Sequence, residues 1–158
     1  MDIVVNASPL ILLGKIGRLH LLNDLFDTVY IPLAVLQEIQ MAEKTEVELN
    51  LSSIMFQHLK VTNKVAVLGL LGRLHIGEVE VMVGAIESGI QQVALDDNAA
   101  RNKAKQLGLD VTGTLGILLR AHANGLIVDL GQEILNLKRA GMYLSDDIVK
   151  KIMASHGK

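Results

Sequence analysis

The segment of residues 77–101, GEVEVMVGAIESGIQQVALDDNAAR, constrains the fold more than any other part of the chain. It predicts a helix, a turn at Ser88 and Gly89, a short apolar strand and then the adjacent acids Asp96 and Asp97. Open α/β sheets place their ligand crevice at the carboxyl ends of the strands. The segment therefore predicts a strand that carries two carboxylates to a functional edge of a sheet.

The helix of this segment is predicted to have one buried face. At 3.6 residues per turn, Glu78 lies at the edge of that face, whereas Glu80 and Glu87 lie on the opposite, solvated side. The apolar residues expected on the buried face are Val79, Val81, Met82, Val83, Ala85 and Ile86. Glu78 is thus the acid of this helix that is expected to reach the sheet.

Strands and helices alternate along the rest of the chain. Strands are expected at residues 2–5, 28–31, 59–62 and 110–112 and in QVALDD, although residues 44–64 give the least clear pattern. Helical segments are expected at residues 10–26 (broken near Gly14 and Gly17), 32–43, 98–107, 114–125, 129–140 and 145–154. Ser8 is expected to cap the first helix, with Pro9 at its first position. Apolar strands separated by helices predict one α/β domain, residues 1–158, with a mostly parallel sheet covered on two sides.

Composition excludes several classes of protein. The chain has no cysteine, which excludes disulfides and thiolate chemistry and fits a cytoplasmic protein. A net charge of −2 is not that of a protein that coats nucleic acid, and aromatic residues at 3% make a base-stacking platform improbable. No apolar run is long enough for a membrane span, and Asp2 argues against a signal peptide. Phosphate binding, if present, must be local or assisted by a metal.

Five polar residues from separate elements are expected to share one end of the sheet. Asn6 follows the first strand, Glu38 flanks the inward face of its helix, and Glu78, Asp96 and Asp97 complete the set. Carboxylate and amide oxygens without His or Cys favour Mg²⁺ or Mn²⁺ over zinc, and two such ions can activate a water against a phosphodiester. Each residue also has a structural interpretation: a helix-dipole contact for Glu78, helix caps for Asp96 and Asp97, and a solvated flank for Glu38.

Other catalytic motifs are absent. The histidines lack the HExxH spacing, and the sequence contains neither GxSxG nor a phosphate-binding glycine loop. Arg101, Lys103 and Lys105 follow the acid pair closely enough to hold a phosphate backbone. A charged helix face is more often simply solvated.

The order of several segments provides a further signal. They are VVNASPLILLGKIGRLHLL, IPLAVLQEI, GEVEVMVGAIESG, VALDDNAARNKAKQLGLDVTGTLGILLRAHANGLI and AGMYLSDDIVKKIM. Together, and over nearly the whole chain, they resemble the PIN-like nucleases, within them the small prokaryotic group described as DUF3368. The resemblance implies a three-layer α/β/α fold and an acidic site that holds Mg²⁺ or Mn²⁺ for cleavage of RNA.

The resemblance also assigns roles to residues. The four positions of its acidic motif correspond to Asn6, Glu38, Glu78 and Asp97. Asp96 is an auxiliary metal ligand in this assignment, and the hydroxyl of Thr112 or Thr114 lies near the attacking water. From its position shortly after the acid pair, Arg101 is expected to contact the RNA phosphate. The first position usually holds Asp in this family, and an amide there ligates a cation without contributing charge.

These observations favour a metal-dependent endoribonuclease. The resemblance further implies the toxin of a type II toxin–antitoxin pair, which a small antitoxin protein neutralises. A homodimer is a separate expectation for the assembly. One alternative is a non-catalytic PIN-like module that binds RNA or a protein partner. A phosphatase of the haloacid-dehalogenase type is disfavoured, because no DxD follows the first strand.

Overall fold

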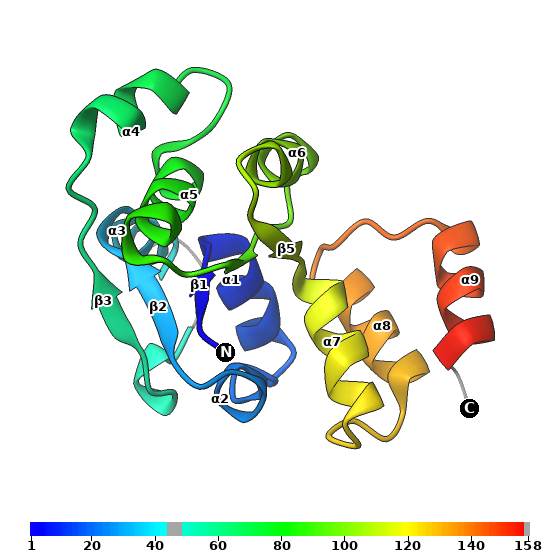
Figure 1. Ribbon diagram of the computed structural model, residues 1–158. Helices are drawn as coiled ribbons and strands as arrows, with labels where there is room; N and C mark the ends of the chain where they lie inside the picture. Colours follow the sequence, from blue (N-terminus) through cyan, green and yellow to red (C-terminus); the bar gives the residue numbers. More distant parts are fainter. Residues whose placement is uncertain (44–48, 157–158) are drawn as a thin grey trace.

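A computed structural model describes residues 1–43 and 49–156 and contains one five-stranded sheet (Figure 1). The strand order is β3-β2-β1-β4-β5, and every neighbouring pair is parallel. The strands are β1 (Ile3–Val5), β2 (Val29–Pro32), β3 (Gln57–Leu59), β4 (Gln92–Ala94) and β5 (Asp110–Thr112). The predicted parallel α/β fold is confirmed.

Helices cover the sheet on two sides. The described helices are α1 (Ala7–Lys15), α2 (Leu21–Leu25), α3 (Leu33–Glu43), α4 (Lys64–Leu70), α5 (Ile76–Ser88), α6 (Asn98–Gln106), α7 (Thr114–Ala123), α8 (Leu130–Arg139) and α9 (Asp146–His156). The connection from β1 to β2 runs along the sheet in the opposite direction to those from β3 to β4 and from β4 to β5. Because such crossovers are right-handed, α1 and α2 lie on one face, and α5 and α6 lie on the other. Since α7 contacts α1 and α2, the layers are α/β/α.

The core is centred on β1 and α5. All three side chains of β1 are inaccessible to solvent, as expected for a central parallel strand. Helix α5 contacts β1, β2 and β4 and also packs against α3 and α4. A methyl group at Gly84 of α5 would lie 2.6 Å from Leu59 Cδ2, so the missing side chain lets the helix approach β3. This packing fixes the start of α5 relative to the ends of the strands.

A second, smaller core joins the C-terminal helices (Figure 1, yellow to red). Leu130 and Ile134 of α8 pack there with Leu144. An ion pair ties this unit to the α1–α2 connection, because Arg18 donates to Glu133 Oε1 at 2.5 and 3.0 Å. The Glu133 side chain is 7% exposed. The loop between α8 and α9 is therefore held close to α1.

Several local predictions need correction. Asn6, and not Ser8, occupies the N-cap position of α1, because Ala7 is already helical. Gly14 lies within α1, and the helix ends before Gly17, whose φ of 70° suits glycine. Strand β3 lies at Gln57–Leu59, earlier than the predicted 59–62, because an edge strand with one buried residue leaves a weak sequence pattern. Residues 44–48 of that unclear region lie outside the described residues.

Helices α4 and α5 also depart from expectation. Helix α4 was not predicted, and none of its side chains is buried although most are apolar. Ile86 of α5, predicted to face the core, is 50% exposed. Glu80 is half-buried and accepts a hydrogen bond from the Ala34 amide at 3.0 Å, so it caps the start of α3 instead of facing water. Glu87 is exposed, as predicted, and accepts hydrogen bonds from the amides before α4.

No helix among residues 1–43 and 49–156 is both long and apolar enough to cross a membrane.

Candidate active site at the carboxyl ends of the strands

The strand order reverses between β1 and β4. The chain leaves β1 toward β2, whereas β4 leads to β5 on the other side, so the connections diverge above this pair. This is the point at which open α/β sheets bind ligands. Asn6 directly follows β1, and its backbone N–H donates to Ala94 O in β4 at 3.1 Å. The polar residues after the two strands therefore lie side by side.

A cleft of about 650 Å³ opens at this edge. All five polar residues predicted to converge line it: Asn6, Glu38, Glu78, Asp96 and Asp97. They come from the ends of β1 and β4 and from α3 and α5. The rest of the lining comes from α1, from His75 and from the loop between α8 and α9. Residues far apart in sequence thus share one solvent-filled space.

Asn6 has an unsatisfied oxygen in this cleft. The residue is 6% exposed, and its Oδ1 is buried without a hydrogen-bond donor among the described residues. A methyl group at Gly77 would lie 3.4 Å from this oxygen and 3.1 Å from Glu38 Oε2. Gly77 therefore leaves open the space that the two oxygens border. Since an orphaned buried acceptor is costly, a cation in that space would satisfy it.

Glu78 and Glu38 are held differently. Glu78 is 6% exposed, and its Oε1 accepts the His75 amide at 3.0 Å in the capping box that begins α5. Glu38 stays open to solvent at the rim. Partial desolvation still raises the pKa of Glu38; the nearby His75 opposes this shift, and the Glu78 charge adds to it. Burial of the Glu38 carboxylate therefore outweighs the favourable charge of His75, and the repulsion from Glu78 is the smallest of the three effects.

Asp97 and Asp96 have distinct structural roles. Asp97 is the N-cap of α6, with Oδ2 accepting from the Ala100 amide at 3.0 Å. Asp96 accepts from the Ser8 hydroxyl at 2.8 Å, from the Thr114 hydroxyl at 2.6 Å and from the Thr114 amide at 2.7 Å. These bonds engage both Asp96 oxygens, whereas Asp97 Oδ1 has no hydrogen-bond donor among the described residues. Asp97 is therefore better prepared than Asp96 to bind a ligand.

The remaining predicted site residues do not line the cleft. Thr114 is fully buried and reaches the site only through Asp96. The Thr112 hydroxyl makes a long contact of 3.4 Å with Gly113 O. Arg101 donates from Nη1 to Leu95 O at 2.9 Å, which directs one guanidinium nitrogen toward the end of β4. Their assigned roles at a metal or at RNA stay predictions.

Ten of the residues that line the cleft were not among the predicted site residues, and three of these ten have titratable side chains. His75 precedes α5 and lines the cleft beside Glu78; its position as N-cap is a signal that the sequence contained. Lys15 and Tyr143 line the cleft from α1 and from the loop between α8 and α9. They lie 128 positions apart in the numbering, so only the packing of α8 near α1 brings them together. No local sequence pattern marks either one.

The carboxylates do not form a ready-made metal cage. Among residues 1–43 and 49–156, no three His, Cys, Asp or Glu side chains are placed to enclose an ion. In Glu78 and Asp97, one carboxylate oxygen accepts a hydrogen bond from a backbone amide at the start of a helix. The other oxygen, Glu78 Oε2 or Asp97 Oδ1, is left for a ligand. With the Asn6 oxygen and the Gly77 cradle, this donor set suits a hard cation that keeps several waters.

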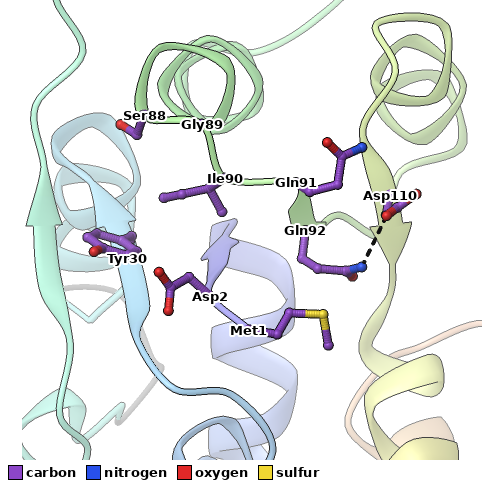
Figure 2. Close-up of a pocket in the computed structure, with 9 residues that line it drawn as sticks. All are labelled: Met1, Asp2, Tyr30, Ser88, Gly89, Ile90, Gln91, Gln92 and Asp110. Carbon is purple, nitrogen blue, oxygen red and sulfur yellow. Dashed lines mark hydrogen bonds between the residues drawn. The ribbon is translucent and has the colours of Figure 1, made fainter.

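A second hollow of about 520 Å³ lies at the amino ends of the strands (Figure 2). Asp2 and Tyr30 border one side of it, and Gln92 on the other side contacts Asp110 at 3.4 Å (Figure 2). Among the residues that the structure describes, no lysine, arginine or histidine lines it. Its two carboxylates come from opposite sides and do not reproduce the convergence seen at the carboxyl ends.

Comparison with protein families matches residues 2–158 to the DUF3368 family, described as a PIN domain. The chain therefore belongs to this PIN-domain family. Membership indicates a nuclease-type protein that binds nucleic acid, and PIN domains generally depend on a divalent metal. A search of curated proteins gives no significant match.

Proposed function

We propose that this PIN domain is a metal-dependent endoribonuclease, and that Asn6, Glu38, Glu78 and Asp97 hold Mg²⁺ or Mn²⁺ in the acidic cleft. The observation that carries the proposal is the buried Asn6 oxygen without a donor, which faces the space kept open by Gly77. Bound there, the metal would supply an activated water and stabilise the leaving oxygen of a phosphodiester. In this proposal residues 1–158 act as one catalytic domain.

The chain's own residues set the geometry of that site. Capping hydrogen bonds to the starts of α5 and α6 orient Glu78 and Asp97, and each leaves one oxygen toward the cleft. Glu38 approaches from α3 beside Gly77. Asp96 acts behind them, because it joins the starts of α1 and α7 through Ser8 and Thr114. Orientation by rigid helix starts is a common way to preorganise catalytic groups.

RNA as substrate and a toxin role rest on the family resemblance. Relatives of this kind act with a small neutralising protein, and we propose the same arrangement here. A short reading frame directly upstream, whose product suppresses both growth arrest and RNA cleavage on co-expression, would support this arrangement. Growth arrest that persists with the neighbouring product present would oppose it.

The catalytic proposal is tested by paired glutamate variants. Glu78→Gln and Asp97→Asn should each abolish Mn²⁺-dependent cleavage of a mixed RNA pool while the far-ultraviolet circular dichroism stays unchanged. Glu80→Gln is the matched control: it lies on the same helix, but its carboxylate caps α3 at the Ala34 amide. Equal loss of cleavage in both glutamate variants would refute the assigned orientation.

A second measurement tests metal binding directly. Selective binding to the folded state should raise the melting temperature in Mn²⁺, and calorimetry should show a site that Asp97→Asn weakens. No heat of binding at millimolar Mn²⁺ would count against the nuclease.

A non-catalytic module that binds RNA or a protein is the second candidate. The spread of the carboxylates and the uncharged Asn6 favour it. It predicts RNA or partner binding that is insensitive to Mn²⁺, with no cleavage product at any metal concentration.

A further inference from the structure

The wall of the cleft formed by the end of α1 and the loop between α8 and α9 carries positive charge. Lys15, in the last turn of α1, donates from Nζ to Ala140 O at 3.2 Å, which places an exposed ammonium at the rim. A further hollow of about 340 Å³ continues from there, because Lys15 and Ala140 line both spaces. Asn136 and Arg139 line only the second hollow. A path lined by cations therefore leads away from the acidic cleft.

An aromatic ring stands beside this path. Tyr143 lines the cleft although it is 88% exposed, and it makes no hydrogen bond or ring contact with any described residue. Its neighbours are anchored: the Met142 amide donates to Leu137 O at 3.0 Å, and Leu144 is buried in the C-terminal core. The backbone on both sides of Tyr143 is thus fixed while its ring lies in water.

Charge limits how a nucleic acid can approach the acids. Glu38, Glu78, Asp96 and Asp97 all line the cleft and repel phosphate. Lys15 is the one lysine or arginine among the described residues that line it. A strand is therefore expected to keep its backbone toward that wall. Exposed aromatic rings next to cationic side chains are the usual means of holding single strands, because every unpaired base offers a face for stacking.

We propose that single-stranded RNA binds along this wall, with one unpaired base stacked on Tyr143 and adjoining phosphates on Lys15 and Arg139. The inference rests on the proposed function for the choice of RNA. It differs from the multi-aromatic platform that composition excludes, because it requires a single ring. A duplex base has both faces covered, so this site selects unpaired RNA close to the acids.

Binding without a divalent metal tests the proposal separately from cleavage. Fluorescein-labelled adenosine and uridine hexamers are titrated in EDTA, with anisotropy as the readout. Tyr143→Ala should weaken binding at least about fivefold, and Tyr143→Phe should bind as the native protein does, because stacking needs only the ring. Val128→Ala, a change at a side chain 94% exposed between α7 and α8, should have no effect.

The cations are tested by salt dependence. Lys15→Gln and Arg139→Gln should each weaken binding and lower the slope of log affinity against log salt by about 0.7. Lys64→Gln removes the same charge at the start of α4, outside both hollows, and should leave the slope unchanged. A blunt RNA duplex should bind the native protein and Tyr143→Ala equally weakly.

The outcomes separate the two proposals. If binding depends on Tyr143 but no Mn²⁺-stimulated cleavage occurs, the single-stranded RNA site is supported and the nuclease proposal is refuted. If Tyr143→Ala cleaves a single-stranded substrate below its KM at the native rate, the single-stranded RNA site is refuted and the nuclease proposal stands. The strand site is also overturned if Tyr143→Phe loses as much affinity as Tyr143→Ala, if the duplex binds as tightly as the hexamers, or if no hexamer binds.

Discussion

Replacing Gly77 by alanine separates the chemistry of the cleft from the stability of the fold. Gly77 is the second residue of α5, and an added methyl group would lie 3.1 Å from Glu38 Oε2, 3.4 Å from Asn6 Oδ1 and 3.5 Å from Val35 Cγ2. The contact with Val35 is an ordinary one. The contact with Glu38 requires a shift of a few tenths of an ångström, which an exposed side chain can make.

The expected effects therefore have opposite signs. Alanine in a helix is favoured over glycine by up to about 1 kcal/mol, so the free energy of unfolding should stay the same or rise. Cleavage should fall roughly tenfold, because the methyl group fills the space between Asn6 and Glu38, and a displacement of about 1 Å can cost about a hundredfold. Gly69→Ala in α4 is the matched control, since apart from its chain neighbours and the backbone of α4 no atom of the described residues lies within 4 Å of the added methyl group.

The assay combines chemical denaturation with Mn²⁺ titration and RNA cleavage on the same preparations. Gly69→Ala should gain stability with unchanged cleavage and metal affinity. If Gly77→Ala binds Mn²⁺ and cleaves RNA as well as Gly69→Ala does, the space beside Asn6 and Glu38 is not the metal position and the reasoning is refuted.

Three further predictions concern charge. Asn6→Asp should tighten Mn²⁺ binding and raise cleavage if the site binds metal; without a metal site the new charge should only lower the melting temperature, which thermal melts with and without Mn²⁺ distinguish. The pKa of Glu38 is raised in the folded state, so this residue destabilises the fold once the pH exceeds the unfolded pKa of about 4.3. Hydrogen bonds from backbone amides lower the pKa of Glu87, so Glu87 stabilises the fold above that pH and loses this effect in acid. At pH 7 without metal, Glu38→Gln should therefore raise and Glu87→Gln lower the melting temperature, and both differences should vanish near pH 3; shifts of the same sign would contradict this reasoning. Arg18→Met leaves the buried Glu133 charge unpaired and should cost at least about 2 kcal/mol in denaturant unfolding, more than Glu133→Gln; the reverse order would be inconsistent with the buried pair.

The sequence pattern predicted the parts of the fold that depend on local periodicity. Helix α6 and its glycine end at Gly108, strand β5 and the turn at Gly89 lie as expected, because helix ends and short apolar strands are marked by neighbouring residues. The inward orientation of Glu78 was predicted correctly, because the helical wheel of α5 alone determines it. Such features need no knowledge of what the element packs against.

Predictions failed where tertiary contacts decide the outcome. The helical wheel predicted that Glu80 faces solvent, but the start of α3 lies beside it and the Ala34 amide donates to its carboxylate. Ile86 belongs to the apolar arc, yet near the C-terminal end of α5 its side chain is 50% exposed. Lys15 and Tyr143 reach the cleft only because the C-terminal helices pack near α1. The acids themselves were found because parallel strands bring their ends together, which is a property of topology and not of any single segment.

The hydrogen bonds around Asp96 affect how the site would look in a mutational screen. Its carboxylate joins the starts of two helices from one face of the sheet, and a side chain on Gly113 would lie 2.9 Å from its Oδ1. Loss of Asp96 should therefore move its neighbour Asp97 and stop cleavage indirectly. A variant library scored only for activity would give Asp96 and Asp97 the same result. A library scored also for the amount of folded protein would distinguish Asp96, which supports the structure of the site, from Asp97, which acts in the site itself.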